Sequence, residues 1–406
     1  MSRKPTVLLV TTMDTKHQES EFVMNRLKEV GVNVYTIDAG IMGESPIPVS
    51  VSREEVARLA GETLSKVQNM GHEGRALAAM IKGAIRKVEQ LYQEGRFDGV
   101  FGLGGSMGTT LGTSVMRTLP VGVPKVMVTT MASRNTRGFV GTKDILMLHS
   151  VCDLAGLNRI TAKVLHNGAM AMAGMVNHPA KARLNDKPLV LLSTLGTTEA
   201  CMKRIRHQLY KDGMDPVVFH TVGSGGQAME EMMAHEAPVA VVDLSLHEIT
   251  DHFFGGDYDA GADRGKGALA AGIPTILAPG NADFLVTGPL EDAKKQFPGR
   301  TYHVHNAAIT ALNTTHEEMA FLGKHLAELC KGAKGPYRVL IPLGGFSAFD
   351  SEGGPLWNPE GRQVYVDHLT ENLPASQVKI LSYHINDPEF AQEVLENLRE
   401  LAATSS

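Results

Sequence analysis

The sequence predicts an α/β protein of two Rossmann-like lobes, in which helices cover mainly parallel sheets. The chain has 406 residues, more than one hydrophobic core normally serves. Short β-branched apolar runs alternate with segments of helical spacing, and this order favours parallel strands joined by helices. The polar segment 178–187, which contains Pro179 and precedes Pro188, indicates a connection between a first lobe at 1–182 and a second at 186–406.

In the first lobe, each predicted strand is a short apolar run that leads into a helical segment. Leu77, Ile81, Ile85 and Val88 recur at intervals of three or four, as on the buried face of a helix. The predicted strands are 6–12, 32–38, 98–102 and 125–128, and the predicted helices are 17–30, 53–60, 74–92, 106–117 and 157–176.

The second lobe repeats this plan. Its predicted strands are 189–193, 216–219, 239–242, 275–278 and 337–342, and its main helices are 200–210, 317–330 and 388–401. In open parallel sheets, ligands bind beyond the carboxyl ends of the strands. The loops at those ends are therefore the candidate binding segments of both lobes.

Composition excludes several classes of partner. The net charge of −5 and the aromatic content of 5% argue against a nucleic-acid-binding protein and a basic membrane surface. The apolar run at 7–10 is too short for a signal peptide or a membrane span. Three scattered cysteines indicate a reducing compartment, so we expect a cytoplasmic protein.

The clearest functional signal is the segment FGLGGSMGTTLG after the strand at 98–102. Gly104, Gly105 and Gly108 let backbone amides approach an anion, and Ser106 and Thr109 add hydroxyls where the next helix begins. The segment matches neither a Walker A loop nor a strict GxGxxG motif. It predicts a phosphate site, and the alternative is a glycine turn that only lets strand and helix pack closely.

Two other strand ends contribute polar groups. After the strand at 125–128, Thr130, Ser133 and Arg134 could contact phosphate, and Asp144 could hold Mg²⁺ through water; the alternative is a polar surface loop. At the end of the first strand, Asp14 and Lys16 lie at the predicted mouth, although helix capping explains part of that segment. These positions would surround the phosphates of a nucleotide.

The second lobe contains a histidine pair, His303 and His305, that would face one side of a strand. Such a pair is a frequent half-site for a transition metal such as Zn²⁺ and needs a third ligand. The alternative is a set of hydrogen-bonded polar residues in an interdomain cleft. The candidate partners in the proposed metal site are Asp243, His247 and Asp251.

A second glycine turn, VGSGGQAME, suggests a site for a substrate oxyanion or carboxylate. Its amides come from Gly225 and Gly226, and neighbouring acidic residues make a triphosphate a poor fit. Asp263, Arg264 and Ser347 are further candidate substrate positions. Ser347 does not stand in a GxSxG elbow, so a hydrolase triad is not predicted.

The assembled motifs resemble the Tm-1-like ATP-binding proteins, also called UPF0261. The matching stretches include TTMDTKHQE, FGLGGSMGTT, VFHTVGSGGQAME, HVHN and HINDPEFA, in order across nearly the whole chain. The resemblance covers the two-lobe form without the TIM-barrel extension of a plant member. It implies an N-terminal lobe that binds ATP with Mg²⁺, and frequent dimers. Arg134 stands where a glycine usually follows the MAS segment, and the second lobe departs from the pattern at DLSLHEITD and DAGADR.

Three functions follow as hypotheses. The first is an ATP-binding enzyme of small-molecule metabolism, with Mg-ATP in the first lobe and a small acid or sugar derivative in the interdomain cleft. The second is a non-enzymatic protein whose partner binding depends on nucleotide. The third is a metal-dependent lyase or hydrolase centred on His303 and His305.

Overall fold

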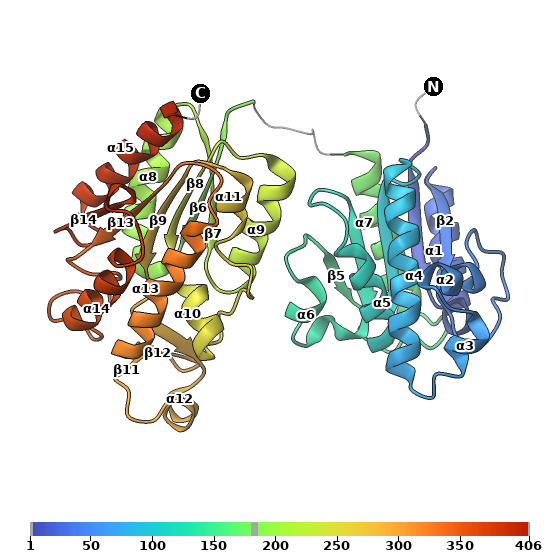
Figure 1. Cartoon of the computed structure of the whole chain (residues 1–406). Helices are drawn as coiled ribbons and strands as arrows, with labels where there is room; N and C mark the ends of the chain where they lie inside the picture. Colours follow the sequence, from blue (N-terminus) through green and yellow to red (C-terminus); the bar gives the residue numbers. More distant parts are fainter. Residues whose placement is uncertain (1–2, 180–185, 405–406) are drawn as a thin grey trace. The chain divides into compact units, whose positions relative to one another are not determined.

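A computed structural model describes residues 3–179 and 186–404 of the chain. The chain divides into two compact units, Met1–Leu184 and Asn185–Ser406 (Figure 1). The predicted connection at 178–187 falls largely on residues 180–185, which lie outside the described residues. The predicted class, two α/β lobes with mainly parallel sheets, is confirmed.

The first unit is built on a five-stranded sheet in the order β2-β1-β3-β4-β5, and every neighbouring pair is parallel. Parallel order places the carboxyl ends of all five strands at one edge. The strands are β1 (Thr6–Thr11), β2 (Asn33–Asp38), β3 (Gly99–Gly104), β4 (Lys125–Thr129) and β5 (Leu146–His149).

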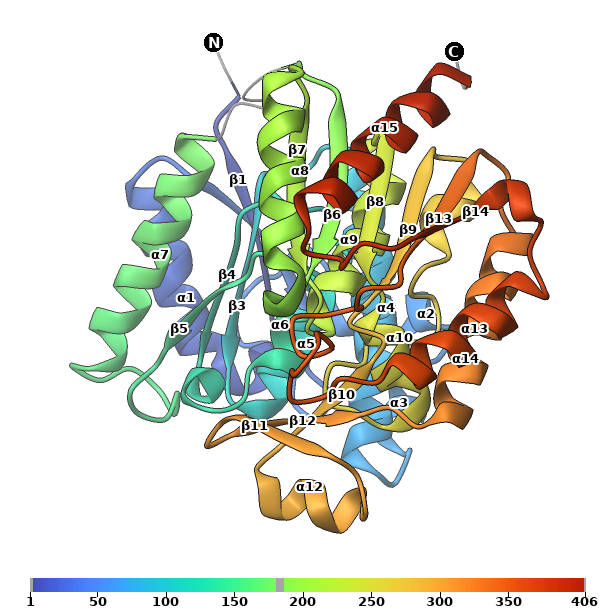
Figure 2. The same cartoon turned by 90° about the vertical axis from the view of Figure 1, so that its left-hand side faces the viewer.

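Helices cover both faces of this sheet, as Figure 2 shows. One face buries Leu8 and Val10 with α2, α4 and α5, and the other buries Val7 and Leu9 with α1 and α7. Alternate residues of one strand thus serve opposite cores. The helices are α1 (Met13–Glu29), α2 (Arg53–Ala60), α3 (Leu64–Gln68), α4 (Glu73–Gln93), α5 (Ser106–Met116), α6 (Arg137–Val140) and α7 (Thr161–Asn177), with a 3₁₀ turn, η1, at Thr130–Ser133.

The second unit has a six-stranded sheet in the order β14-β13-β9-β8-β6-β7, again parallel throughout. Leu192 and Val242 face the core formed with α8 (Glu199–Lys211) and α15 (Pro388–Thr404). Leu191 and Val241 face the core formed with α9 (Ser224–Glu236) and α11 (Gly267–Ala271). The strands are β6 (Leu189–Thr194), β7 (Asp215–His220), β8 (Ala240–Ser245), β9 (Thr275–Gly280), β13 (Tyr337–Pro342) and β14 (Val378–Leu381).

A small antiparallel sheet, which the sequence did not reveal, is added to the second unit. Its order is β10-β12-β11, with β10 (Phe284–Thr287), β11 (Tyr302–Asn306) and β12 (Ile309–Asn313). The helices of this unit are α8 (Glu199–Lys211), α9 (Ser224–Glu236), α10 (His247–Phe254), α11 (Gly267–Ala271), α12 (Leu290–Gln296), α13 (His316–Lys331), α14 (Pro359–Thr370) and α15 (Pro388–Thr404), with 3₁₀ turns η2 (Gly196–Thr198) and η3 (Ala375–Gln377). No helix among the described residues is long and apolar enough to cross a membrane.

Two helix starts differ from prediction for reasons visible in the structure. Helix α1 begins at Met13, not at 17, because the carboxylate of Asp38 accepts the amide of Met13 at 3.0 Å and caps the helix from a neighbouring strand end. Helix α7 begins at Thr161, not at 157, because the Asn158 side chain accepts the amides of Ile160 and Thr161.

Candidate functional site

The glycine turn between β3 and α5 serves packing at two positions and leaves a third open. Gly104 has φ +151°, and a Cβ there would lie 2.9 Å from the Cα of Gly108. A Cβ on Gly108 would meet the carbonyl oxygen of Leu103 at 2.9 Å. A Cβ on Gly105, by contrast, would find only the Thr130 hydroxyl, at 3.9 Å. Close packing therefore explains Gly104 and Gly108 but not Gly105.

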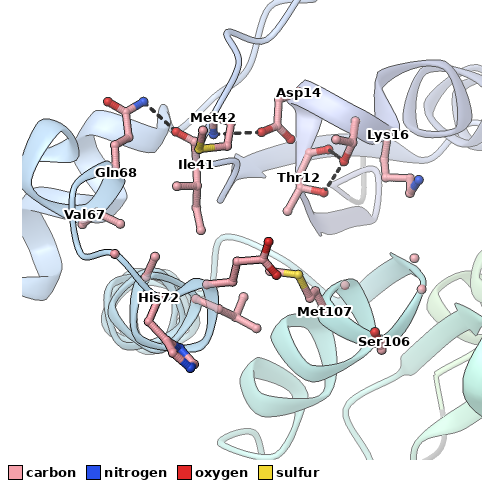
Figure 3. Close-up of a pocket in the computed structure, with 18 residues that line it drawn as sticks. Thr12, Asp14, Lys16, Ile41, Met42, Val67, Gln68, His72, Ser106 and Met107 are labelled. Atoms are coloured by element: carbon pink, nitrogen blue, oxygen red, sulfur yellow. Dashed lines mark hydrogen bonds between the residues drawn. The ribbon is translucent and has the colours of Figure 1, made fainter.

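A pocket of about 640 Å³ opens beside this turn, at the carboxyl edge of the sheet (Figure 3). Its polar end is formed by Gly104–Gly108 and by the segment Thr12–Lys16. Gly105 is the N-cap residue of α5, and its position has no side-chain cap, so the first amides of that helix face the polar end. Predicted site residues that line the pocket are Asp14, Lys16, Gly104, Gly105, Ser106 and Gly108.

The opposite end of the pocket is apolar, and the sequence did not predict it. Ile41 and Met42 come from the loop after β2, Val67 from α3 and Leu77 from α4. Met42 is 78% exposed and Met107, on the α5 side, is 41% exposed, so apolar surface is left open at the rim. This combination suits a ligand with an anionic end and a flat apolar end.

The two carboxylate oxygens of Asp14, on the pocket wall, have different surroundings. Its Oδ2 accepts the amides of Met42 at 3.2 Å and Gly43 at 3.3 Å, whereas its Oδ1 is buried with no hydrogen-bond partner among the described residues. Behind it, burial raises the pKa of Asp38, and the nearby charge of Asp14 adds to that effect, although two backbone amides oppose it. Two carboxyl groups, those of Asp14 and Asp38, thus lie close together at this end of the pocket.

Lys16 lies at a kink in α1, with φ −125° and ψ 21° inside the helix. Its Nζ donates to the carbonyl oxygen of Leu154 at 2.6 Å. Lys16 is the one lysine among the described residues of the pocket wall; its ammonium group is tied to the backbone, and its single positive charge would offset only part of the charge of a polyanionic ligand.

Four predicted nucleotide contacts do not line the pocket. Thr109 is buried, and its hydroxyl donates to the carbonyl oxygen of Gly105 at 2.7 Å, so it supports the turn from within. Thr130 lies beside Gly105, whereas Ser133 and Arg134 are exposed on and after η1. Asp144, predicted to hold Mg²⁺, instead pairs with buried Lys125 at 2.7 Å.

The second glycine turn, at the start of α9, is already filled. The Oε1 of Glu248 accepts the amide of Gly223 at 2.7 Å and that of Gly226 at 3.0 Å. A Cβ on Gly226 would lie 1.9 Å from the Glu248 carboxylate. The turn does bind a carboxylate, as its geometry suggested, but the carboxylate belongs to the protein, so the assignment of Gly225 and Gly226 to substrate is corrected.

Arg264 completes this arrangement as a structural residue. Its guanidinium is buried and contacts Asp243 at 2.5 and 2.7 Å and Glu248 at 2.8 Å. Burial opposes its charge, but the carboxylates outweigh burial and raise the pKa of Arg264. Burial also disfavours the charged form of Glu248 and raises the pKa of its carboxyl group, although the nearby charge of Arg264 acts in the opposite direction. Asp263, in contrast, is exposed and pairs with Lys266 at 3.1 Å.

The predicted metal ligands are not brought together. A register shift on β11 disrupts the alternation at His305, and His303 packs its ring 4.6 Å from that of Phe349. Asp243 is engaged by Arg264, and His247 lies 3.4 Å from Asp251 within α10. Across 3–179 and 186–404, no group of three or more His, Cys, Asp or Glu residues is placed to hold a metal ion.

Ser347 belongs to another buried cluster. Its hydroxyl donates to Oδ2 of Asp283 at 2.6 Å. Burial raises the pKa of Asp283 to about 8, with a further contribution from the charge of Asp350, and its Oδ1 has no partner among the described residues. Ser347 is thus held as a hydrogen-bond donor inside the unit.

Fold and site together define an α/β protein of two Rossmann-like units whose first unit carries a glycine-walled pocket at the carboxyl edge of its sheet. Models of two domains match the chain: "Uncharacterised protein family (UPF0261) N-terminal domain" at residues 5–181 and the corresponding C-terminal domain at 187–402. The chain belongs to the UPF0261 family.

Relatives agree with this assignment. A UPF0261 protein of Clostridium tetani is 35% identical over 95% of this chain and 96% of its own. The "ToMV resistance protein Tm-1(GCR237)" of Solanum lycopersicum is 31% identical over 100% of this chain but 57% of its own length. A solved UDP-GlcNAc 2-epimerase from Neisseria meningitidis covers 90% of this chain and 100% of its own, at 8% identity and a TM-score of 0.24, too low to support a shared function.

Proposed function

We propose that the N-terminal unit binds ATP together with Mg²⁺ in the pocket beside the glycine turn. The observation that carries this proposal is the two-ended lining of a single cavity of about 640 Å³. The amides at Gly105–Gly108 offer hydrogen bonds and the positive end of α5 to the phosphates. Ile41, Val67 and Leu77 offer an apolar slot to the base.

The Mg²⁺ part of the proposal rests on the charge of the polar end. Asp14 and Glu73 line the pocket, and Lys16 donates to Leu154. A triphosphate placed there would be repelled unless a divalent cation screened it. The carboxylate of Asp14 lies on the pocket wall, and such hard oxygen ligands suit Mg²⁺, directly or through water.

Calorimetry on the full chain tests the proposal. We expect saturable binding of ATP in Mg²⁺ and weaker binding with a chelator present. Inorganic triphosphate lacks the base, so it should lose the apolar term of about 2 kcal/mol, which is roughly 30-fold in Kd. Adenosine, without phosphates, should bind weakly as well. No saturable heat with ATP, or equal affinities for ATP and triphosphate, would contradict this arrangement.

A turnover measurement then separates the two classes of protein that use such a site. An ATP-dependent enzyme of small-molecule metabolism consumes ATP when its co-substrate is present. A nucleotide-dependent binding protein changes partner affinity without consuming ATP. The relative named "ToMV resistance protein" makes the second class a concrete candidate.

A further inference from the structure

A second pocket, of about 370 Å³, lies wholly within the second unit, away from the glycine turns. Three segments form its walls: the start and end of the β11–β12 hairpin, the first turn of α13, and the stretch that leads into α14. None of the functions considered above uses this pocket.

Its most distinctive residue is Trp357, the only tryptophan in the chain. The side chain is 46% exposed, although tryptophan is on average a highly buried residue. Pro355 and Pro359 flank it, and Pro359 opens α14, so the backbone on both sides is restricted. A large, rigid aromatic surface is thus held open on the pocket wall.

The walls around this indole are fixed in advance by ion pairs and hydrogen bonds. The guanidinium of Arg300 donates to the Glu318 carboxylate at 2.7 and 2.5 Å and to the carbonyl oxygen of Asn313 at 2.8 Å. This ties the hairpin to α13. On the other wall, the amide of Asn358 donates to Asp350 at 2.9 Å. The pocket therefore does not have to be ordered when a ligand arrives.

The groups that line it are polar but not cationic. Thr301, His316 and Glu317 are exposed at the pocket and offer a hydroxyl, an imidazole and a carboxylate. Backbone hydrogen bonding lowers the pKa of Glu317, which keeps it ionised as an acceptor. None of the described lining residues is lysine or arginine. The charge of Glu317 would repel a phosphate or carboxylate ligand.

We infer that this pocket binds the neutral pyranose ring of a hexose. One face of such a ring is a patch of C–H groups that packs against an indole, and its rim is a circle of hydroxyls that both donate and accept. Trp357 supplies the platform, Glu317 accepts from two hydroxyls, and His316 and Asn358 complete the rim. The cavity is large enough for a small ligand.

Intrinsic fluorescence tests this directly, because the single tryptophan reports only on this pocket. The full chain is titrated with the methyl pyranosides of glucose, galactose, mannose and N-acetylglucosamine, and with sorbitol as the open-chain comparison. At least one pyranoside should give a saturable change in emission, and sorbitol should not. No saturable change with any of the four, or an equal change with sorbitol, overturns the inference.

Variants separate binding at this pocket from binding elsewhere. Glu317→Gln keeps the shape but loses a charge-assisted acceptor, so Kd should rise about tenfold. Glu371→Gln, on an exposed residue at the other end of α14, is the matched control and should bind as the wild type does. Equal Kd in the two variants overturns the inference. Trp357→Ala, followed by saturation-transfer NMR and circular dichroism, should lose binding while remaining folded; retained binding overturns it as well.

The inference stands apart from the proposed nucleotide site, since the two pockets share no residue. A variant that loses ATP binding should therefore still bind the pyranoside, and Glu317→Gln should still bind ATP.

Discussion

Replacing Gly105 by aspartate should strongly weaken ATP binding without weakening the fold. Gly105 is the N-cap of α5 with φ −77° and ψ −155°, a conformation open to any residue, and a Cβ there meets only the Thr130 hydroxyl at 3.9 Å. Aspartate is a better N-cap than glycine by a few tenths of a kcal/mol, because its carboxylate accepts amides of the first turn. The thermal midpoint should therefore stay the same or rise slightly.

The same carboxylate would occupy the amides meant for a phosphate and would repel it. At a separation of about 5 Å and an effective dielectric constant of about 20, one charge pair costs about 3 kcal/mol, or roughly 100-fold in Kd. Calorimetry with Mg-ATP measures this loss, and thermal unfolding measures stability in parallel.

Two controls make this result interpretable. Gly105→Ala adds a methyl group without a charge and should keep most of the affinity. Gly174→Asp places the same charge on an exposed glycine of α7 with open space around it, and should bind ATP normally. If Gly105→Asp binds ATP within threefold of the wild type, the glycine turn is not the phosphate site.

Three further predictions concern charged side chains that are buried or line the nucleotide pocket. Asp14→Asn keeps an acceptor for the amides of Met42 and Gly43 but loses the charge, so the ratio of ATP affinities with and without Mg²⁺ should fall towards one; an unchanged ratio would show that Asp14 does not serve the metal. Arg264→Leu leaves the buried carboxylates of Asp243 and Glu248 without their cationic partner and should lower the free energy of unfolding in urea by about 3–5 kcal/mol. A loss below about 1 kcal/mol would mean that the ion pairs are not a structural requirement. The pKa of Asp283 is raised to about 8 in the folded state, so the unfolded chain loses this proton at a lower pH than the folded chain does. The free energy of unfolding should therefore fall between about pH 4 and 8, and Asp283→Asn should remove that part of the pH dependence. Parallel plots of unfolding free energy against pH for the variant and the wild type would refute this.

The regular elements could be predicted because their signals are local. Helix α2 occupies Arg53–Ala60 as predicted, since Ser52 caps it and Gly61 ends it in a left-handed conformation. Most strands of the parallel sheets were predicted from apolar runs such as Leu189–Thr194, which is buried on both faces. The edge strands β5 and β14, of four residues each, were not predicted. The antiparallel sheet was missed because β10 is only four residues long and has no pattern of its own.

The site could be predicted only where its groups lie next to one another in sequence. The glycine turn and Asp14 follow strand ends directly, and both line the pocket, as predicted for the edge of the sheet. The apolar wall was not, because Ile41 lies in a loop and Val67 in a five-residue helix, where side chains have no readable period. Gly226 was misassigned for a related reason, since Glu248, which fills its turn, comes from the next helix along the fold.

The filled turn of the second unit sets up a contrast within one chain. At α9 the amides of Gly223 and Gly226 are permanently held by Glu248, whereas at α5 the position of Gly105 has no side-chain cap. Amide protons exchange with solvent only when their hydrogen bonds open. The amides of Gly223 and Gly226 should therefore exchange slowly with and without nucleotide, whereas the first turn of α5 should exchange rapidly and should slow when nucleotide is added. Equal exchange rates at both turns, unchanged when nucleotide is added, would contradict this interpretation. In it, the start of α9 is capped by a side chain of the protein, whereas the start of α5 is capped by a bound ligand.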